Sequence, residues 1–176
     1  MGSGRARDVA STMIAALLLL AGCGPSFNGR LYQGKGIKFE AGEMPSCWHG
    51  IEAEGTLLSF RDDEHDATIA VNGRCGKDAE DVPLGALTQH LFLQFTERKI
   101  TEQRLQPMDG REAMRTILTA KLDGVEKAFA IYVLKKDGCV WDFLYVSRPE
   151  GISAELPKFD RFVAGFHAIS GQAGSN

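Results

Sequence analysis

The stretch "DGREAMRTILTAKLDGVEKAFAIYVLKKDG", residues 109–138, decides the fold. Its three Asp-Gly pairs, at 109–110, 123–124 and 137–138, recur every 14 residues. Asp-Gly favours the two-residue type I′ hairpin turn, because both central residues of that turn need positive φ. The regular spacing therefore predicts successive antiparallel hairpins.

The segments between these turns have the pattern of strands. In 111–122 and 125–136, apolar, β-branched and aromatic residues alternate with polar ones, which indicates strands with one buried face. Residues 139–147 continue the pattern, and 100–108 form a weaker strand before the first turn. Together they predict a four-stranded antiparallel meander. Helices within 111–134 are the alternative, since alanine and leucine are frequent there, but the regular turns favour strands.

Shorter strands are predicted upstream of the meander. The segments "GIKFE" (36–40), "TLLSF" (56–60) and "DATIAV" (66–71) are rich in apolar and β-branched residues. The polar run 61–66 forms the turn between the last two.

Two segments have apolar residues at helical spacing. One is residues 83–96, which open with Pro83, and the other begins near Pro157. The spaced residues are Leu84, Leu87, Leu91 and Phe95 in the first segment, and Phe159, Phe162, Val163 and Phe166 in the second. This spacing is typical of a helix packed on a sheet. Segregated strands and helices favour the α+β class, so we predict an antiparallel β-sheet meander covered by helices.

The N-terminal segment has the pattern of an export signal. Arg5 and Arg7 precede an apolar stretch, residues 9–21. A membrane-spanning helix needs roughly 17 to 25 apolar residues, and this stretch is shorter. A basic flank followed by a short apolar core is typical of a signal peptide.

The end of this segment, Leu20-Ala21-Gly22-Cys23, resembles the lipobox of bacterial lipoproteins. The resemblance implies cleavage before Cys23, a diacylglycerol on its thiol and acylation of the new amine. Two or three acyl chains would anchor the protein stably to a membrane. The alternative is a buried amphipathic helix with an incidental cysteine. Gly24, in place of the aspartate that indicates inner-membrane retention, favours the outer membrane.

These patterns divide the chain into four parts. Residues 1–22 are the signal peptide, 23–35 the lipidated cysteine with a flexible, glycine-rich tether, 36–170 a single α+β domain, and 171–176 a disordered tail. Removal of the signal peptide shifts the formal net charge from −3 to −4. A mildly acidic chain lacks the basic surface that nucleic acid requires, so no nucleic-acid partner is expected.

Three cysteines follow the lipidation site. Cysteines of exported proteins tend to pair, and an odd number leaves one over. Cys75 ends a predicted strand and Cys139 begins another, so this pair is favoured. Cys47 with Cys75 is the next candidate, and three reduced thiols are the alternative. No metal site is expected, because no C-x-x-C motif or histidine pair at ligand spacing occurs.

The segment "PSCWHG", residues 45–50, holds the candidate binding residues Trp48 and His49. Tryptophan is enriched at binding hot spots, although Trp48 would more often cap the core. The acidic turn "RDDEHDA" (61–67) offers oxygen ligands for calcium, but its spacing differs from known loops, and a solvated hairpin tip is favoured. Catalytic motifs such as G-x-S-x-G and H-E-x-x-H are absent, and we expect neither catalytic residues nor a cofactor.

The order of these elements resembles the PsbP-like family, which includes periplasmic DcrB-like lipoproteins. The resemblance spans residues 36–168 and is carried by "IKFEAGEMPSCW", "LLSFRDDEHDATIAV", "PLGAL", "LQPMDGREAMRTILTAKLDG", "AIYVLKKDGCVWDFLYVSRPE" and "FDRFVAGFHAI". It implies an antiparallel sheet with helices on its faces and a noncatalytic protein. The three cysteines after the lipobox depart from the family pattern.

The sequence therefore predicts a noncatalytic binding or assembly module on the bacterial envelope. Its expected partners are the membrane, through the lipid on Cys23, and an envelope protein. The second hypothesis is an accessory lipoprotein that binds a small molecule or metal through Trp48, His49 and the acidic turn. An envelope hydrolase, with polar groups brought together by folding, is the third.

Overall fold

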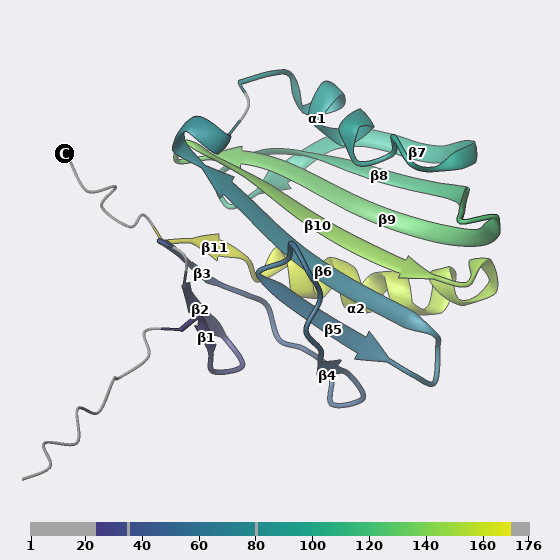
Figure 1. Cartoon of the computed structure of the whole chain (residues 1–176), viewed down its shortest axis with the longest axis horizontal. Helices are drawn as coiled ribbons and strands as arrows, with labels where there is room; N and C mark the ends of the chain where they lie inside the picture. The colour runs from purple at the N-terminus through teal and green to yellow at the C-terminus, as the bar shows by residue number, and fades with distance from the viewer. Residues whose placement is uncertain (1–23, 35, 80, 170–176) are drawn as a thin grey trace, which may run out of the picture.

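The computed structural model describes residues 24–34, 36–79 and 81–169 (Figure 1). The predicted signal peptide, the lipidation site Cys23 and the predicted tail 171–176 lie outside these residues. No helix of the described ranges is long and apolar enough to span a membrane.

The predicted hairpins form four long strands. These are β7 (Thr96–Met108), β8 (Arg111–Leu122), β9 (Val125–Lys136) and β10 (Cys139–Ser147). Both residues of every Asp-Gly pair adopt positive φ, between 47° and 79°, which the type I′ turn requires. The strand boundaries of β8, β9 and β10 agree with the sequence prediction, and β7 begins four residues earlier than expected.

The meander belongs to a larger antiparallel sheet. Its other strands are β4 (His49–Gly50), β5 (Leu58–Asp62) and β6 (Ala67–Cys75), and the order is β4-β5-β6-β10-β9-β8-β7. β10 hydrogen-bonds to β6, so the two halves of the sheet are continuous. β7 forms one edge.

A second, smaller antiparallel sheet lies at one end of the large sheet (Figure 1). It consists of β1 (Ser26–Phe27), β2 (Leu31–Gly34), β3 (Ile37–Glu40) and β11 (His167–Ala168), in the order β1-β2-β3-β11. The first and last described strands therefore belong to the same sheet, at its two edges.

The prediction of a flexible tether over residues 23–35 is wrong for the described part, 24–34. Tyr32 on β2 is buried and its ring stacks on Phe39 with the centroids 5.0 Å apart. Gly29 and Gly36 have positive φ next to the ends of β2, so these glycines serve tight turns. The folded domain thus begins at least ten residues before the predicted boundary at residue 36.

The first helix is shorter than predicted. α1 (Leu84–His90) ends five residues before Phe95, and successive i→i−3 hydrogen bonds then tighten the chain through Leu91, Phe92 and Leu93. The helix ends although Leu91 and Phe95 both pack against the hydrophobic cluster that contains Leu87. The chain must reverse here to enter β7, which overrides the helical pattern.

The second helix begins earlier than predicted. α2 (Ile152–Ala164) follows the short 3₁₀ helix Pro149–Gly151 and contains Pro157 in its interior. Proline removes one backbone donor, but burial of Phe159, Phe162 and Val163 compensates. A second 3₁₀ helix, Gly76–Asp78, follows β6.

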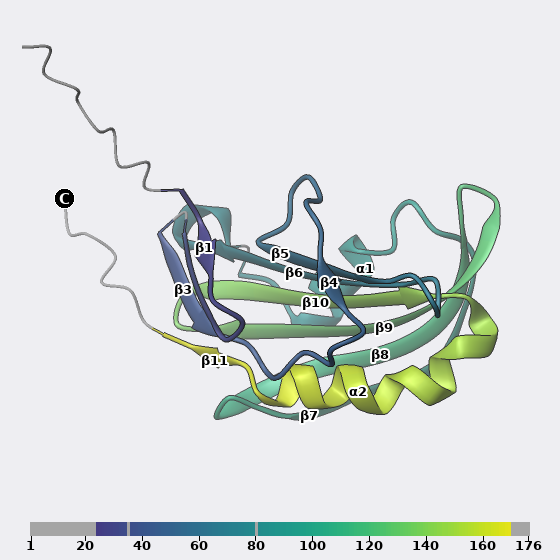
Figure 2. The ribbon, with the colours of Figure 1, turned by 90° about the horizontal axis from the view of Figure 1, so that it is seen from below.

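Two hydrophobic clusters lie on opposite faces of the large sheet. On one face, α2 and the small sheet pack around rings that include Trp141, Phe143 and Phe166. On the other face, Leu87 of α1 and Phe92 after it pack against apolar side chains of β8 and β9. Figure 2 shows α2 running along its side of the large sheet.

The prediction of a helix-covered α+β sandwich is therefore wrong. The described residues are 51% strand and 18% helix, and a second antiparallel sheet shares the face of the large sheet with α2. The seven residues of α1 are too few to cover the other face alone. The segment taken for a tether supplies two strands of that second sheet.

Candidate functional site

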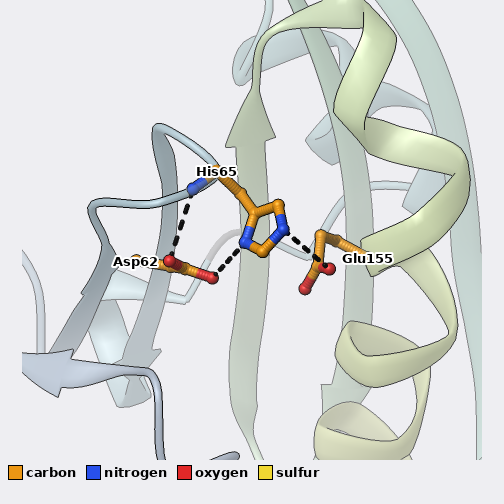
Figure 3. Close-up of side chains that lie close together, drawn as sticks. All are labelled: Asp62, His65 and Glu155. Carbon is orange, nitrogen blue, oxygen red and sulfur yellow. Dashed lines mark hydrogen bonds and ion pairs between the residues drawn. The ribbon is translucent and has the colours of Figure 1, made fainter.

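Two carboxylates and an imidazole meet at the end of the large sheet that lies away from the small sheet (Figure 3). Asp62 is the last residue of β5, His65 belongs to the turn into β6, and Glu155 lies in the first turn of α2. One ligand atom of each lies within 4.8 Å of the others. We call these residues the Asp-His-Glu cluster.

Asp62 organises the turn in which His65 lies. Its carboxylate is 1% exposed and accepts the backbone N–H of Glu64 at 3.0 Å. The other carboxylate oxygen accepts the ring Nδ1–H of His65 at 2.8 Å. An aspartate that bonds to the backbone two residues ahead stabilises such a turn, so this local interaction fixes the position of the imidazole.

Glu155 approaches the imidazole from the helix. Its Oε1 lies 3.7 Å from His65 Nε2 and accepts a hydrogen bond from Lys158 Nζ at 2.7 Å. Its Oε2 is buried and has no hydrogen-bond partner. Buried carboxylate oxygens are normally paired, so this atom is a free acceptor within the cluster.

Hydrogen bonding and burial have opposite effects on the pKa values of Asp62 and His65. The hydrogen bond to Asp62 raises the pKa of His65, against the effect of burial, and the charge of Glu155 adds to the rise. Burial alone would raise the pKa of Asp62, but the hydrogen bonds from His65 outweigh it and lower the pKa. The hydrogen bond to Glu155 is the main cause that raises the pKa of Lys158. The cluster can thus hold a proton or a cation between two buried carboxylates.

The candidate residues Trp48 and His49 point in different directions. Trp48 is 8% exposed and its ring lies 6.2 Å from that of Tyr145, so it packs in the core. The side chain of His49 is 54% exposed, and its Nε2 lies 3.7 Å from the carboxylate of Asp63. The structure does not bring these two residues into one site.

Cys75 and Cys139, the pair favoured by the sequence, form a disulfide between β6 and β10. Cys47 is exposed and free.

Two of the three residues of the Asp-His-Glu cluster lie in a turn that the sequence singled out. The acidic turn contains Asp62 and His65, but Glu155 was missed because the second helix was predicted to begin near Pro157, after this residue. The only available signal was the spacing of Glu155 and Lys158, which three residues apart share one helical face.

Comparisons with known proteins identify the fold. No family model matches the chain, and no curated protein is similar to it in sequence. Among solved structures, it is similar to cyanobacterial PsbP (CyanoP) from Synechocystis sp. PCC 6803, with 16% identity, a TM-score of 0.54, and coverage of 85% of this chain and 99% of that one.

Two further solved structures have the same arrangement. LpqN of Mycobacterium tuberculosis, described as involved in cell envelope biogenesis, has 10% identity and a TM-score of 0.55, covering 76% of this chain and 86% of its own. The Ran-binding protein Mog1p of Saccharomyces cerevisiae has 11% identity and a TM-score of 0.52, covering 82% and 97%. At such identities the likeness concerns the fold alone, and that fold is PsbP-like.

Proposed function

We propose that this protein is a lipid-anchored lipoprotein of a bacterial envelope, and that its folded domain is a noncatalytic binding or assembly module. The observation that carries the proposal is the tetrapeptide Leu20-Ala21-Gly22-Cys23 directly after a short apolar stretch with a basic flank. LpqN, which has a similar fold, is described as involved in cell envelope biogenesis, and the proposal extends that association with the envelope to this protein.

The start of the folded domain gives the anchor a defined geometry. β1 begins at Ser26, three residues after Cys23. An extended chain spans at most about 3.6 Å per residue, so the lipid would be attached within roughly 11 Å of the small sheet. The small sheet would then face the membrane, and the opposite end of the large sheet would face away from it.

The edge strand β7 offers a surface for a protein partner. It is 13 residues long and its outer backbone edge has no neighbouring strand in the described sheet. Ile100 and Leu105 on this strand are 44% and 50% exposed. An open edge with exposed apolar side chains can accept an additional strand.

Site-specific photo-crosslinking in intact cells tests the proposal. We expect a photoreactive residue at Ile100 or Leu105 to capture one and the same envelope protein, and a residue at exposed Glu54 to capture none. Identical crosslinking at all three positions, or none above background, would contradict a specific binding module.

A metal-binding accessory protein is the second candidate function. It is favoured by the Asp-His-Glu cluster, in which two buried carboxylates face an imidazole.

A further inference from the structure

We propose that Asp62, His65 and Glu155 bind a divalent first-row transition cation, for which Zn²⁺ is the best match. Each residue supplies one ligand atom, and water completes the coordination. The proposal gives a site to the second candidate function and does not depend on lipid attachment.

The spacing of the three groups fits a single ion. The ligand atoms lie within 4.8 Å of one another, so a point equidistant from them is at most about 2.8 Å from each. Zn²⁺ bonds to carboxylate oxygen and imidazole nitrogen are about 2.0–2.2 Å long. Binding of one ion by all three groups also requires the imidazole to turn, because Nδ1 faces Asp62 and Nε2 faces Glu155 without the ion.

The free oxygen of Glu155 is the observation that points to a ligand. The Glu155 side chain is 3% exposed, Lys158 occupies only Oε1, and Oε2 has no partner. Figure 3 shows the Glu155 carboxylate directed at the imidazole of His65, which lies between it and Asp62. A buried charged oxygen without a partner is costly, and a cation in the cluster would remove that cost.

The site also has a rigid frame and an access route. Asp62 is held by the backbone N–H of Glu64, and Glu155 is fixed on α2. The His65 side chain is 33% exposed, so the imidazole forms the solvent side of the site. Three protein ligands with an open position are typical of zinc sites that exchange ligands.

The ligand types select among metals. Imidazole suits zinc, copper, iron and nickel, whereas calcium and magnesium prefer sites made of oxygen alone. One imidazole with two carboxylates therefore favours a transition cation over calcium, which the acidic turn alone would have suggested.

Competition with a chromogenic chelator tests the site in the full-length protein, purified in detergent with Zn²⁺ as the only added metal. We expect binding of one equivalent with a micromolar or lower Kd. Glu155→Gln and His65→Gln should weaken it at least tenfold, and His49→Gln, which alters an exposed histidine on β4, should leave it unchanged. A folded wild-type protein that binds no Zn²⁺ at about 100 μM, or equal losses in all three variants, would overturn the proposal.

Lys158→Met distinguishes a metal site from a cluster that only stabilises the fold. Lys158 competes with the metal for Glu155, so its removal should tighten Zn²⁺ binding at least threefold. Unchanged or weaker binding would overturn the proposal, even if the glutamine variants fail to fold. Cys23→Ala should bind Zn²⁺ as the wild type does, so failure of the anchor and failure of the metal site are distinguishable.

Discussion

Arg115 is a buried charge that connects β8 to three other elements of the fold. From β8 it donates to the hydroxyl of Tyr132 at 2.8 Å, to Asp160 on α2 at 3.0 Å, and to Glu102 on β7. Tyr132 in turn donates to Asp160 at 2.8 Å. Burial and the neighbouring Asp160 raise the pKa of Tyr132 to about 12, so the hydroxyl is a donor at neutral pH.

Replacement of Arg115 by methionine should destabilise the protein. The change keeps the apolar part of the side chain but removes its hydrogen bonds. One of these partners, Tyr132, is buried, and another, Asp160, is a carboxylate. We expect the free energy of unfolding to fall by about 2 kcal/mol, measured by urea denaturation. Arg104→Met, which removes a 56% exposed side chain, should change it by less than about 0.5 kcal/mol. Equal effects would show that the buried network contributes nothing.

Asp109 links the first Asp-Gly turn to the end of the chain. Its carboxylate accepts the backbone N–H of Ala168 at 2.9 Å and Nδ1–H of His167 at 2.7 Å. Burial alone would raise the pKa of Asp109, but these hydrogen bonds and the charges of His167 and Lys136 lower it. A single side chain thus joins the meander to β11 of the small sheet.

The lowered pKa makes this contact sensitive to acid. A carboxyl whose pKa is lower in the folded state stabilises the protein above its unfolded pKa, near 4, and loses that contribution as pH falls through the folded pKa. Asp109→Asn preserves a turn-forming residue before Gly110 but cannot titrate. The loss of stability from about pH 5 to pH 2 should therefore be smaller in this variant than in the wild type, measured by urea midpoints. Parallel pH profiles would contradict the role of Asp109.

At the scale of elements, the disulfide connects the two halves of the large sheet. Cys75 and Cys139 are directly opposite in the register of β6 and β10, and they are 64 residues apart in sequence. A crosslink of that span restricts the unfolded chain substantially. It therefore favours the pairing of the upstream strands with the meander.

Removal of this disulfide should destabilise the protein strongly. The double variant Cys75→Ala/Cys139→Ala should lose about 3 kcal/mol of unfolding free energy in urea denaturation. Cys47→Ala is the matched control, since Cys47 is exposed and free, and it should unfold as the wild type does. A double variant as stable as the control would contradict the stabilising role of the crosslink.

Elements set by local signals were the predictable ones. The Asp-Gly pairs fixed the ends of β8, β9 and β10, because a type I′ turn and a period-2 pattern are both local properties. The end of α1 and the start of α2 depend on tertiary packing. α1 ends where the chain turns toward β7. α2 continues through Pro157 because the burial of its apolar face stabilises the helix on both sides of the proline.

Only the part of the candidate site that depends on local structure could be predicted from the sequence. Asp62 and His65 belong to one turn, and their hydrogen bond is local. Glu155 reaches them because α2 packs along β9 and β10, which no sequence spacing encodes. Trp48, proposed as a binding residue, lies in the core because its ring fills space beside Tyr145.

At the scale of the whole molecule, the sequence suggested the PsbP-like fold but not its layers. Residues 24–34 are glycine-rich, and the sheet that they form with β3 is completed by a non-local pairing of β3 with β11, so they resembled a tether. The aromatic contacts of Tyr32 with Phe39, and of Phe39 with Trp141, show why the segment folds. The second sheet is thus built from the two ends of the described chain.

This arrangement predicts an orientation on the membrane. With lipid on Cys23, a fluorophore on Gln33→Cys in the small sheet should be quenched by nitroxide-headgroup lipids more than one on Glu64→Cys at the far end of the large sheet. Both positions are exposed, and both labels should be placed in the Cys47→Ala background. Stronger quenching at position 64 would contradict attachment next to the small sheet.

Acylation of Cys23 is the most direct test of the central claim, that this domain is held on a bacterial envelope by lipid. Cells that express the full chain would be fed labelled palmitate, and the protein isolated from wild type, Cys23→Ala and Cys47→Ala. We expect label in the wild type and in Cys47→Ala and none in Cys23→Ala. A wild-type protein that carries no label and retains Met1, or equal labelling of all three proteins, would contradict the account.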